Sequence, residues 1–537
     1  MPATGFSRRF ARPDDLTLGD IVTDNAVRFG DVVAYRHGDR TVTHAQLRDR
    51  AVRLVSAMAD VGVRRQDRIA VLSRNGIEFG ELIAATQLSG IIMATINFRL
   101  SPPEIADVLR RVEPRILFVS DEFVPVLADI ARQLPSPPVL VAIAGEAPPG
   151  HPPVASLAPG MTGYERFVEG GRSGEPEFVA VPDDIACLLF TSGTTGAAKC
   201  CILGQREMRD VAFTMSNEMQ CGSADRGLIN MPMFHVGALA IIGGLHARGG
   251  TVVLQQQFDA ADAVALIAAR RITLLHLAPV MLKALLDQVD DESSVKSVQT
   301  VVYSAAPMTA AILRRAIAAL PDAGFLNLYG QTEVIVSGLP RELHDLVSPD
   351  AEERLRSVGF PFPGIRIRVV GEDGRDVPAG EAGEIVVRAG STFRGYLDDQ
   401  AATQATLRDG WCHTGDVGRI DERGLLFLVD RKRDVIISGG ENVYSPEVED
   451  AICALDGVVA CAVVGIPDEK WGEAVCAVVV PCDGAPPTLE ALQEGVRKRL
   501  ARYKVPRRLV LVTELPMLPS GKVDKKRLRA DLKADAG

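Results

Sequence analysis

The sequence predicts an α/β protein with a large N-terminal domain and a smaller α+β domain at its C-terminal end. From Arg68 onward, short apolar runs alternate with helical patterns, which is typical of parallel strands joined by helices. After about Pro361 the pattern alternates between apolar and polar residues, with Gly-containing turns, which indicates an antiparallel or barrel-like sheet. Helical and strand patterns are mixed again in the residues after Asp434.

The first elements follow one another closely. RIAVLS (68–73) reads as a strand and GIEFGELIAATQLSG (76–90) as a helix. Ser101 and Glu104 form a capping box with Pro102 at the first helical position, so the next helix begins there. The run ILFVS (116–120) is the strand that follows, which completes a repeated strand–helix pattern.

A region rich in Pro and Gly, from Pro135 to Pro176, is expected to be a long surface connection. The strand pattern then resumes with ACLLF (186–190) and continues through GTVVL (250–254), ITLLHLAP (272–279), SVQTVVYSAAPM (297–308) and AGFLNLYGQTE (323–333).

The alternating runs of the later part are IRIRVV (365–370), GEIVVR (383–388) and GLLFLVD (424–430). The charged run DRKRD (430–434) comes next, and by itself it is as well explained by a solvated turn as by a functional segment. We place the domain boundary in this run. The domains expected are thus 1–430 and 434–537, with 431–433 between them.

Composition excludes some classes of protein. The formal net charge of −10 over 537 residues argues against a general nucleic-acid binder, which needs a basic face. The nine cysteines show no zinc-type spacing, so we expect free thiols in a reducing, cytoplasmic setting. No secretory signal and no apolar run long enough to span a membrane is evident. The sequence leaves the oligomeric state open, a homodimer included.

The segment TSGTTGAAKC (191–200) is rich in glycine and hydroxyl residues and ends near Lys199. Backbone N–H groups in such a turn can bind an anion, and the lysine adds a positive charge, so phosphate is the expected ligand. The Walker A pattern does not fit, which excludes a P-loop NTPase. A plain polar loop is the alternative.

Three further segments carry chemistry. In NLYGQTEV (327–334), Glu333 could hold Mg²⁺ and Thr332 could bind a phosphate oxygen, unless the segment is only a tight turn. In GWCHTGDVG (410–418), Asp416 lies in a glycine-flanked turn and could bind a ribose diol or form an Asx-turn. In PSGKVDKKRLR (519–529), Lys522 could reach a carboxylate and a phosphate together, or belong to a solubilising tail.

Each segment alone is a weak signal, but their order is specific. Together with MPMFHVGA (231–238), SGGENVYSPEVE (438–449) and GIPDEKWGE (465–473), they make the chain resemble the adenylate-forming superfamily of acyl-CoA synthetases, adenylation domains and beetle luciferases. The resemblance implies stacked α/β sheets plus a distorted β-barrel in the large domain, and a small, mobile α+β C-terminal domain.

The reaction that the resemblance implies has two steps. The carboxylate of an acid attacks the α-phosphate of ATP, with Mg²⁺ present, and gives an acyl-adenylate and pyrophosphate. The thiol of coenzyme A then displaces AMP. A carboxylate is a poor acyl electrophile, whereas a mixed anhydride with AMP has a good leaving group.

The resemblance also implies roles for individual residues. Lys522 would bridge the substrate carboxylate and the α-phosphate, Thr332 would meet the α-phosphate, and Glu333 would hold Mg²⁺. Asp416 and Arg431 would hold the ribose. The remaining residues expected to bind the nucleotide are Thr191, Ser192, Gly193, Thr194, Thr195 and Lys199 at the phosphates, and Ala306, Pro307, Asn327, Tyr329, Gly330 and Gln331 near adenine.

The family's C-terminal domain rotates between the half-reactions about a hinge, at which this chain has Arg433. Rotation would remove Lys522 and bring Gly439, Gly440 and Glu441 to the site, where glycines let pantetheine pass close to the backbone. Trp471 and Tyr503 resemble positions that bind the CoA nucleotide, although Trp471 is nearly as well explained by core packing.

The acyl pocket implied by the resemblance uses His235, Val236, Ser304, Ala305 and Val334. Relatives often have Gly-Gly where Ser304 and Ala305 stand, so the pocket should be narrower near the carboxylate. Medium-chain, aryl and arylalkanoic acids remain open. Ala198 and Cys200 replace the usual Pro and Gly beside Lys199, with a modest effect expected on ATP affinity.

Three alternatives stay open beside an acid–CoA ligase. The enzyme could load the phosphopantetheine of a carrier protein, although this chain shows no carrier domain. It could be an oxygenase like luciferase, which we disfavour. It could also be a catalytically silent nucleotide-binding relative, against which the presence of Glu333, Asp416, Arg431 and Lys522 argues.

Overall fold

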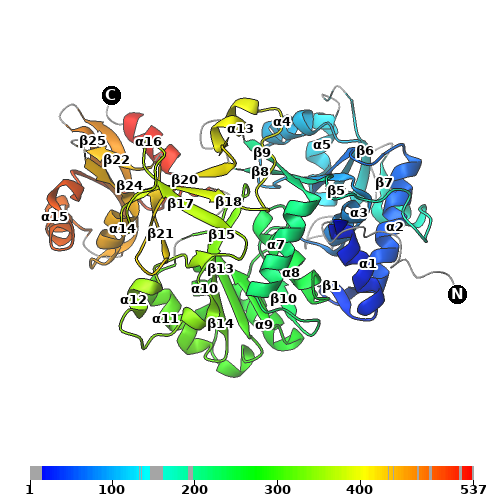
Figure 1. Ribbon diagram of the computed structural model, residues 1–537, viewed down its shortest axis with the longest axis horizontal. Coiled ribbons are helices and arrows are strands. Elements are labelled where there is room, and N and C mark those ends of the chain that lie inside the picture. The colour runs from blue at the N-terminus through cyan, green and yellow to red at the C-terminus, as the bar shows by residue number, and fades with distance from the viewer. Residues whose placement is uncertain are drawn as a thin grey trace. The chain divides into compact units, whose positions relative to one another are not determined.

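In the computed structural model (Figure 1), the chain divides into two compact units, which are described one at a time. Unit 1 comprises Met1–Arg366 and Arg388–Cys412, and unit 2 comprises Ile367–Val387 and His413–Gly537. The described residues are 15–131, 134, 136–144, 161–191, 198–306, 308–432, 434–438, 441–468, 471–482, 486–518 and 523–534.

Unit 1 contains a seven-stranded sheet in the order β7-β6-β5-β3-β4-β8-β9. Its strands run parallel except β9, which is antiparallel to β8. The parallel pairing follows from helices that join successive strands. The strands are β3 (Arg68–Leu72), β4 (Ile92–Thr95), β5 (Ile116–Ser120), β6 (Val139–Ile143), β7 (Thr162–Gly163), β8 (Ile185–Thr191) and β9 (Lys199–Gly204).

A second sheet of unit 1 has the order β16-β15-β14-β13-β12-β10-β11-β1-β2, and its strands from β14 to β1 are parallel. Ligands bind at the carboxyl ends of parallel strands, so this edge is where a site is expected. The strands are β1 (Val33–His37), β2 (Arg40–Thr43), β10 (Arg226–Ile229), β11 (Thr251–Leu254), β12 (Leu274–Leu277), β13 (Thr300–Ser304), β14 (Gly324–Gly330), β15 (Ile335–Gly338) and β16 (Phe360–Pro361).

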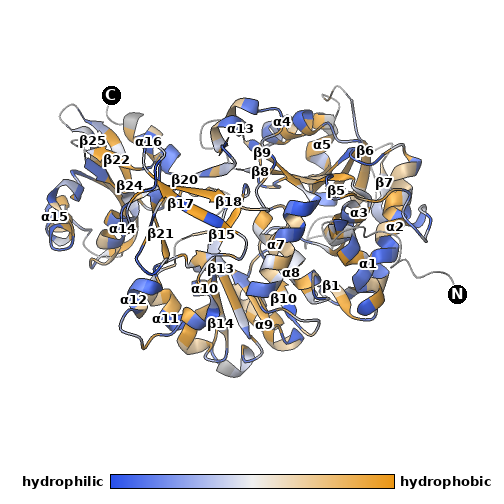
Figure 2. Cartoon of the chain, in the orientation of Figure 1, coloured by the Kyte–Doolittle hydropathy of each residue, from blue (hydrophilic) through white to orange (hydrophobic). Residues whose placement is uncertain are grey.

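The helices of unit 1 cover these sheets, and α7 lies beside α8 (Figure 1). Strands such as β13 and β14 are mainly apolar, whereas helices such as α2 and α7 also carry polar residues (Figure 2). The helices are α1 (Leu18–Arg28), α2 (His44–Asp60), α3 (Ile77–Ser89), α4 (Pro102–Val112), α5 (Val124–Ala131), α6 (Tyr164–Glu169), α7 (Gln205–Glu218), α8 (Val236–His246), α9 (Ala260–Arg270), α10 (Pro279–Leu286), α11 (Ala310–Ala319), α12 (Ala351–Arg354) and α13 (Gln400–Thr406), and the short strand β19 (Leu407–Arg408) follows.

The expected strands and the capped helix α4 are present. Glu104 Oε2 accepts hydrogen bonds from the backbone N–H of Ser101 at 2.8 Å and from its hydroxyl at 2.6 Å. The expectation of one long connection from Pro135 to Pro176 was wrong in part, because β6, β7 and α6 lie within it. The apolar run of β6 is flanked by Pro- and Gly-rich segments, which hid its strand pattern.

One buried amide joins the carboxyl edges of the two sheets. Asn75, 3% exposed, follows β3 and donates to the carbonyl oxygens of Met231 and Gln255, both at 3.1 Å. Its oxygen accepts the backbone N–H of Met233 at 2.8 Å. The hydroxyl of Thr95, at the end of β4, donates to the carbonyl oxygen of Phe234 at 3.0 Å. These bonds hold the loops after β10 and β11 against the ends of β3 and β4.

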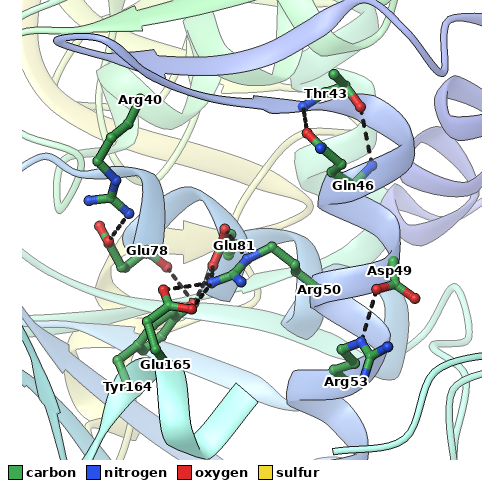
Figure 3. Close-up of polar contacts among 10 residues, drawn as sticks. All are labelled: Arg40, Thr43, Gln46, Asp49, Arg50, Arg53, Glu78, Glu81, Tyr164 and Glu165. Atoms are coloured by element: carbon green, nitrogen blue, oxygen red, sulfur yellow. Dashed lines mark hydrogen bonds and ion pairs between the residues drawn. The ribbon is translucent and has the colours of Figure 1, made fainter. Parts of the chain in front are cut away.

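A buried carboxylate joins α2, α3 and α6 (Figure 3). Glu81, 1% exposed, accepts two hydrogen bonds from Arg50, at 2.6 and 3.0 Å, and one from the Tyr164 hydroxyl at 2.8 Å. Burial alone would lower the pKa of Arg50, but its bonds to Glu81 and Glu165 raise it, so the guanidinium stays charged. A paired and fully bonded charge can be buried without a large penalty.

Unit 2 is built on two groups of strands. In one, β21 pairs with β20 in antiparallel fashion, as the alternating sequence predicts. In the other, of order β23-β22-β25-β24, β26 pairs with β25. The elements are β17 (Arg366–Val370), β18 (Gly383–Arg388), β20 (Trp411–Ile420), β21 (Leu426–Arg431), β22 (Ile436–Ser438), β23 (Glu441–Val443), α14 (Ser445–Cys453), β24 (Val458–Asp468), β25 (Gly472–Pro481), α15 (Leu489–Arg497), β26 (Arg508–Leu511) and α16 (Lys525–Ala534).

Helices cover both faces of the sheet that contains β24 and β25. Val475 and Ala477 pack in one core with Val448 of α14 and Leu492 of α15, whereas Cys476 packs in another core with Leu528 of α16. This arrangement follows from the alternation of side chains along a strand. The chain therefore forms a two-faced α+β layer, as its mixed pattern predicts.

The carboxylates of the charged run DRKRD are bound within unit 2. Asp430 Oδ2 accepts the backbone N–H and the hydroxyl of Ser445, at 2.7 and 2.9 Å. Asp434 accepts from Arg529 of α16 at 2.8 Å. Unit 2 also includes residues that precede the predicted boundary at Asp430. A hinge concerns motion, so a hinge at 431–433 stays a prediction.

All nine cysteines are free thiols. Among the described helices, none combines the length and the apolar character that a membrane span requires.

We predict that Asn75→Ala lowers the free energy of unfolding by about 2–4 kcal/mol, because two carbonyl groups and one N–H group lose their partner in a buried place. Urea-induced unfolding, followed by circular dichroism, measures the change. Asn217→Ala on the exposed surface of α7 is the matched control, and equal unfolding midpoints for the two variants would contradict the role of Asn75.

Candidate nucleotide and acyl site

The strands β8 and β9 bring Thr191 and Lys199 opposite each other. The Thr191 hydroxyl donates to the carbonyl oxygen of Lys199 at 3.4 Å. Lys199 is the first residue of β9, and no carboxylate pairs with its ammonium among the described residues. The ammonium is therefore available to an anion from outside the protein.

Lys199 and Glu333 contact opposite parts of one tyrosine. The Lys199 ammonium lies 4.6 Å from the ring centroid of Tyr396, a cation–π contact. The Tyr396 hydroxyl donates to Glu333 Oε1 at 2.6 Å. Burial, together with the charge of Glu333, raises the pKa of Tyr396, so the phenol stays protonated and remains a donor. Tyr396 thus separates the Lys199 ammonium from the Glu333 carboxylate, two groups that could otherwise form an ion pair.

The turn between β14 and β15 presents Thr332 and Glu333. Gln331 and Val334 exchange two backbone hydrogen bonds, at 2.8 and 3.3 Å, and the two residues between them form the tip. The backbone N–H of Phe393 donates to the Glu333 carbonyl oxygen at 2.7 Å, which fixes the tip further. The segment is a tight turn, as the simpler explanation held, yet its glutamate is half-buried and hydrogen-bonded.

The donor set around Glu333 fits Mg²⁺. This ion takes one or two carboxylates from a protein and fills its other positions with phosphate oxygens and water. Glu333 offers one carboxylate, oriented by a neutral hydroxyl and not neutralised by a cation in the described part of the chain. The thiol of Cys201 also lies beside it, and burial, with the charge of Glu333, raises the pKa of that thiol, so it stays neutral. No group of three or more potential metal ligands occurs among the described residues.

The residues expected near adenine follow two neighbouring strands. Ala306 comes after β13 and is exposed, and Tyr329 and Gly330 end β14. The Asn327 side chain donates to the carbonyl oxygen of Ser357 at 3.2 Å. Tyr329 is 7% exposed, so little of its ring faces outward here. The structure places these residues at one sheet edge, with Gln331 in the turn that follows.

The expected acyl residues lie at the same edge. His235 precedes α8 and Val236 begins it, and both are half-buried. Ser304 ends β13, and Ala305 has a φ of 73°, a left-handed conformation that glycine adopts more easily. Val334 is 1% exposed, so its side chain is buried in the protein interior.

Ser304 has a partner that the sequence analysis did not name. His276 Nε2 lies 2.8 Å from the Ser304 hydroxyl oxygen. A polar residue within the apolar run ITLLHLAP was the available signal, since such a residue must find a partner when it is buried. Tyr396 was missed too, and its only signal was an aromatic residue after glycine in FRGYL (393–397).

Unit 2 brings the two expected ribose residues together. Asp416 of β20 and Arg431 of β21 are cross-strand neighbours, and Arg431 Nε lies 2.9 Å from Asp416 Oδ1. Asp416 is 5% exposed, and it lies in a strand, whereas the sequence suggested a glycine-flanked turn. Its backbone N–H donates to the Thr414 hydroxyl, and Thr414 donates to the Ile385 carbonyl oxygen.

The residues expected to bind CoA lie on neighbouring segments of unit 2, since β23 contacts residues 502–504, and Ser438 pairs with both Glu441 and Gly472, the residue after Trp471. Glu441 begins β23 and is exposed. Trp471 is half-buried and contacts the guanidinium of Arg507, 4.0 Å above its ring, so core packing does not describe it. Tyr503 is half-buried beside the core under α14 and α15.

Nine of the expected site residues lie outside the described residues. They are Ser192, Gly193, Thr194, Thr195, Pro307, Arg433, Gly439, Gly440 and Lys522.

The two unusual neighbours of Lys199 have structural partners. Ala198 accepts a hydrogen bond from Arg111 at its carbonyl oxygen, 2.5 Å away. Cys200 is 0% exposed, packs in the core with Leu188, and is absent from the described non-glycine residues with positive φ. A side chain is therefore accommodated where the resemblance led us to expect glycine, and it contributes to the core.

Family models match both parts of the chain. Residues 22–397 match the AMP-binding enzyme family, and residues 447–522 match the AMP-binding enzyme C-terminal domain. A feruloyl-CoA synthase from Amycolatopsis sp is 34% identical over 502 residues, covering 92% of this chain and 95% of that protein. The fatty acid–[acyl-carrier-protein] ligase ScoC of Streptomyces coeruleorubidus is 32% identical over 498 residues, covering 91% of each.

Among solved structures, the anthranilate CoA ligase AuaEII in complex with anthranoyl-AMP is similar, with a TM-score of 0.87 and 25% identity over 98% of this chain and 99% of that one. The fold, the family matches over both units and the likeness to whole relatives lead to one conclusion. The chain belongs to the AMP-binding enzyme family, in its acyl-CoA synthetase branch.

Proposed function

We propose that this protein is an ATP-dependent acid–CoA ligase. It activates a carboxylic acid as its acyl-adenylate, with release of pyrophosphate, and then transfers the acyl group to coenzyme A with release of AMP. The observation that carries the proposal is the contact of Lys199 and Glu333 with the two ends of Tyr396. A phosphate-binding ammonium and a metal-binding carboxylate, held apart by a neutral group, suit a magnesium–triphosphate substrate.

In the first step, a carboxylate oxygen of the acid attacks the α-phosphorus and pyrophosphate leaves. Lys199 would bind the departing phosphates, and Thr332 at the tip of its turn would donate to an α-phosphate oxygen. A bound Mg²⁺ would neutralise phosphate charge beside Glu333. Lys522 would hold the two anions together, and Asp416 with Arg431 would accept and donate hydrogen bonds at the ribose.

In the second step, the sulfur of CoA attacks the carbonyl carbon of the acyl-adenylate and AMP leaves with the bonding electrons. Glu441, Trp471 and Tyr503, with Gly439 and Gly440, would serve this step, after a rotation at Arg433. The aromatic acids in the names of the feruloyl-CoA synthase and the anthranilate CoA ligase favour an aryl or arylalkanoic acid here.

A carrier-protein ligase is the second candidate, since the relative ScoC acts on an acyl-carrier protein. A panel of acids, supplied with ATP and Mg²⁺, tests the choice when pyrophosphate and thioester are both measured. The ligase predicts an acyl-CoA product by mass spectrometry when CoA is added. Pyrophosphate release without any acyl-CoA, but with loading of a phosphopantetheine carrier, would favour the second candidate.

We expect Tyr396→Phe to lower kcat/KM for MgATP by about 10-fold to 100-fold, because a hydrogen bond to a charged carboxylate is lost while the ring beside Lys199 stays. The Mg²⁺ concentration for half-maximal pyrophosphate release should rise as well. Tyr164→Phe removes a similar bond, from a tyrosine to Glu81, and is the control. A control that weakens MgATP use as strongly would point to a general loss of stability.

We expect Lys522→Ala to abolish acid-dependent pyrophosphate release while the variant still converts supplied acyl-adenylate and CoA to the thioester. The reason is that the charge is needed where two anions meet, in the first step only. Single-turnover assays of each half-reaction measure this. Lys526→Ala, an exposed lysine of α16, should leave both half-reactions intact. Equal loss of both in Lys522→Ala would exclude a separation of the two steps by domain rotation.

A further inference from the structure

Two polar residues stand on one face of neighbouring strands at the acyl edge of unit 1. His276 of β12 pairs in register with Val302 of β13, and Ser304 lies two residues further along β13. Because residues two apart in a strand point to the same face, the two side chains meet, and His276 Nε2 lies 2.8 Å from the Ser304 hydroxyl oxygen.

The histidine is neutral and has one ring nitrogen without a partner. His276 is 1% exposed, and burial lowers its pKa to about 4, so the imidazole carries one proton at neutral pH. Its Nδ1 has no hydrogen-bond partner in the described part of the chain. An unpaired buried N–H is costly, so the proton belongs on Nε2, where it is donated to Ser304.

This tautomer leaves the hydroxyl proton of Ser304 available. The hydroxyl oxygen accepts from His276, and a serine O–H can donate at the same time. Across the described residues, His276 Nε2 is the sole hydrogen-bond partner of this hydroxyl. Ser304 is half-buried, so a substrate that covers the hydroxyl must itself accept the hydroxyl proton if that hydrogen bond is to be kept.

The first turn of α8 adjoins the pair. Gly237 lies in the first turn of α8, directly after His235 and Val236. A Cβ added at Gly237 would have one neighbour within 4 Å beyond its own turn, the His276 Cε1 atom at 3.5 Å. The imidazole edge therefore faces the turn of α8 that begins after His235 with Val236, two residues expected to contact the acyl group.

We propose that Ser304, positioned by His276, donates a hydrogen bond to an oxygen atom on the body of the substrate acid. This inference rests on the proposed acid–CoA ligase and names its substrate class: aryl or arylalkanoic acids that bear a hydroxyl or ether oxygen. An apolar acid of the same shape would cover this hydroxyl without accepting its proton, and would be disfavoured. A glycine at this position could not make this distinction.

The test compares acids that differ in one group. Hydroxyl-substituted and methyl-substituted cinnamic and phenylpropanoic acids, with the substituent at each ring position in turn, have nearly equal shapes. For at least one position we expect the native enzyme to use the hydroxy acid with a kcat/KM about 10-fold higher, the worth of one neutral hydrogen bond. Pyrophosphate release and acyl-CoA formation are both recorded.

Variants assign the preference to the pair. Ser304→Ala should reduce the ratio of hydroxy to methyl acid to about 1, chiefly through a lower kcat/KM for the hydroxy acid. His276→Gln retains a donor and should preserve part of the ratio, whereas His276→Phe should lose it. Ser348→Ala, at a distant turn of unit 1, is the control and should keep the native ratio.

A native ratio near 1 at every position, or an unchanged ratio in Ser304→Ala, would overturn the inference. If the His276 variants do not fold, the ratio of hydroxy to methyl acid in Ser304→Ala alone tests the inference. The ratio is read from pyrophosphate release, so it stands or falls independently of the thiol acceptor. Absence of acyl-CoA would instead count against the proposed function.

Discussion

The amide of Asn75 sets the constraint on which the rest of unit 1 depends. It satisfies two carbonyl groups and one N–H group from the loops after β10 and β11, while it belongs to the segment after β3. Parallel sheets offer their carboxyl ends as binding edges, but one edge alone supplies few groups. Because this buried amide holds two such edges together, residues from both sheets are available to the proposed site.

Tyr396 contacts residues from both of these sheets. Lys199 begins the edge strand of the seven-stranded sheet, and Glu333 lies in the turn after β14 of the nine-stranded sheet. Direct contact between an ammonium and a carboxylate would neutralise both, and each would then be less useful to a phosphate or a metal ion. The tyrosine places an aromatic face against one and a hydroxyl against the other, so both charges stay available.

The proposed preference at the acyl edge would come from one oriented side chain. The side chain of Ser304 was expected to narrow the pocket. In the structure it also takes part in a hydrogen bond. Its hydroxyl is oriented by a buried imidazole, and Ala305 keeps a backbone conformation that glycine adopts with less strain. A hydroxyl that is oriented but half-satisfied discriminates by chemistry, whereas bulk alone discriminates by size.

The sequence by itself determined the fold class, the order of the elements and the family. Strand runs such as ILFVS and the capping box at Ser101 act over a few neighbouring residues, and the ordered motifs carry the chemistry of phosphate and carboxylate binding in their residue types. It failed where local patterns were weak, as for β6 between Pro- and Gly-rich segments, or for Asp416, which lies in a strand and not in a turn. Only the tertiary structure decided which residues meet: Asn75 with Met231, Tyr396 with Glu333, and His276 with Ser304 are far apart in the chain. A hydrogen bond between distant segments depends on strand order and register, and neither can be read from the local sequence.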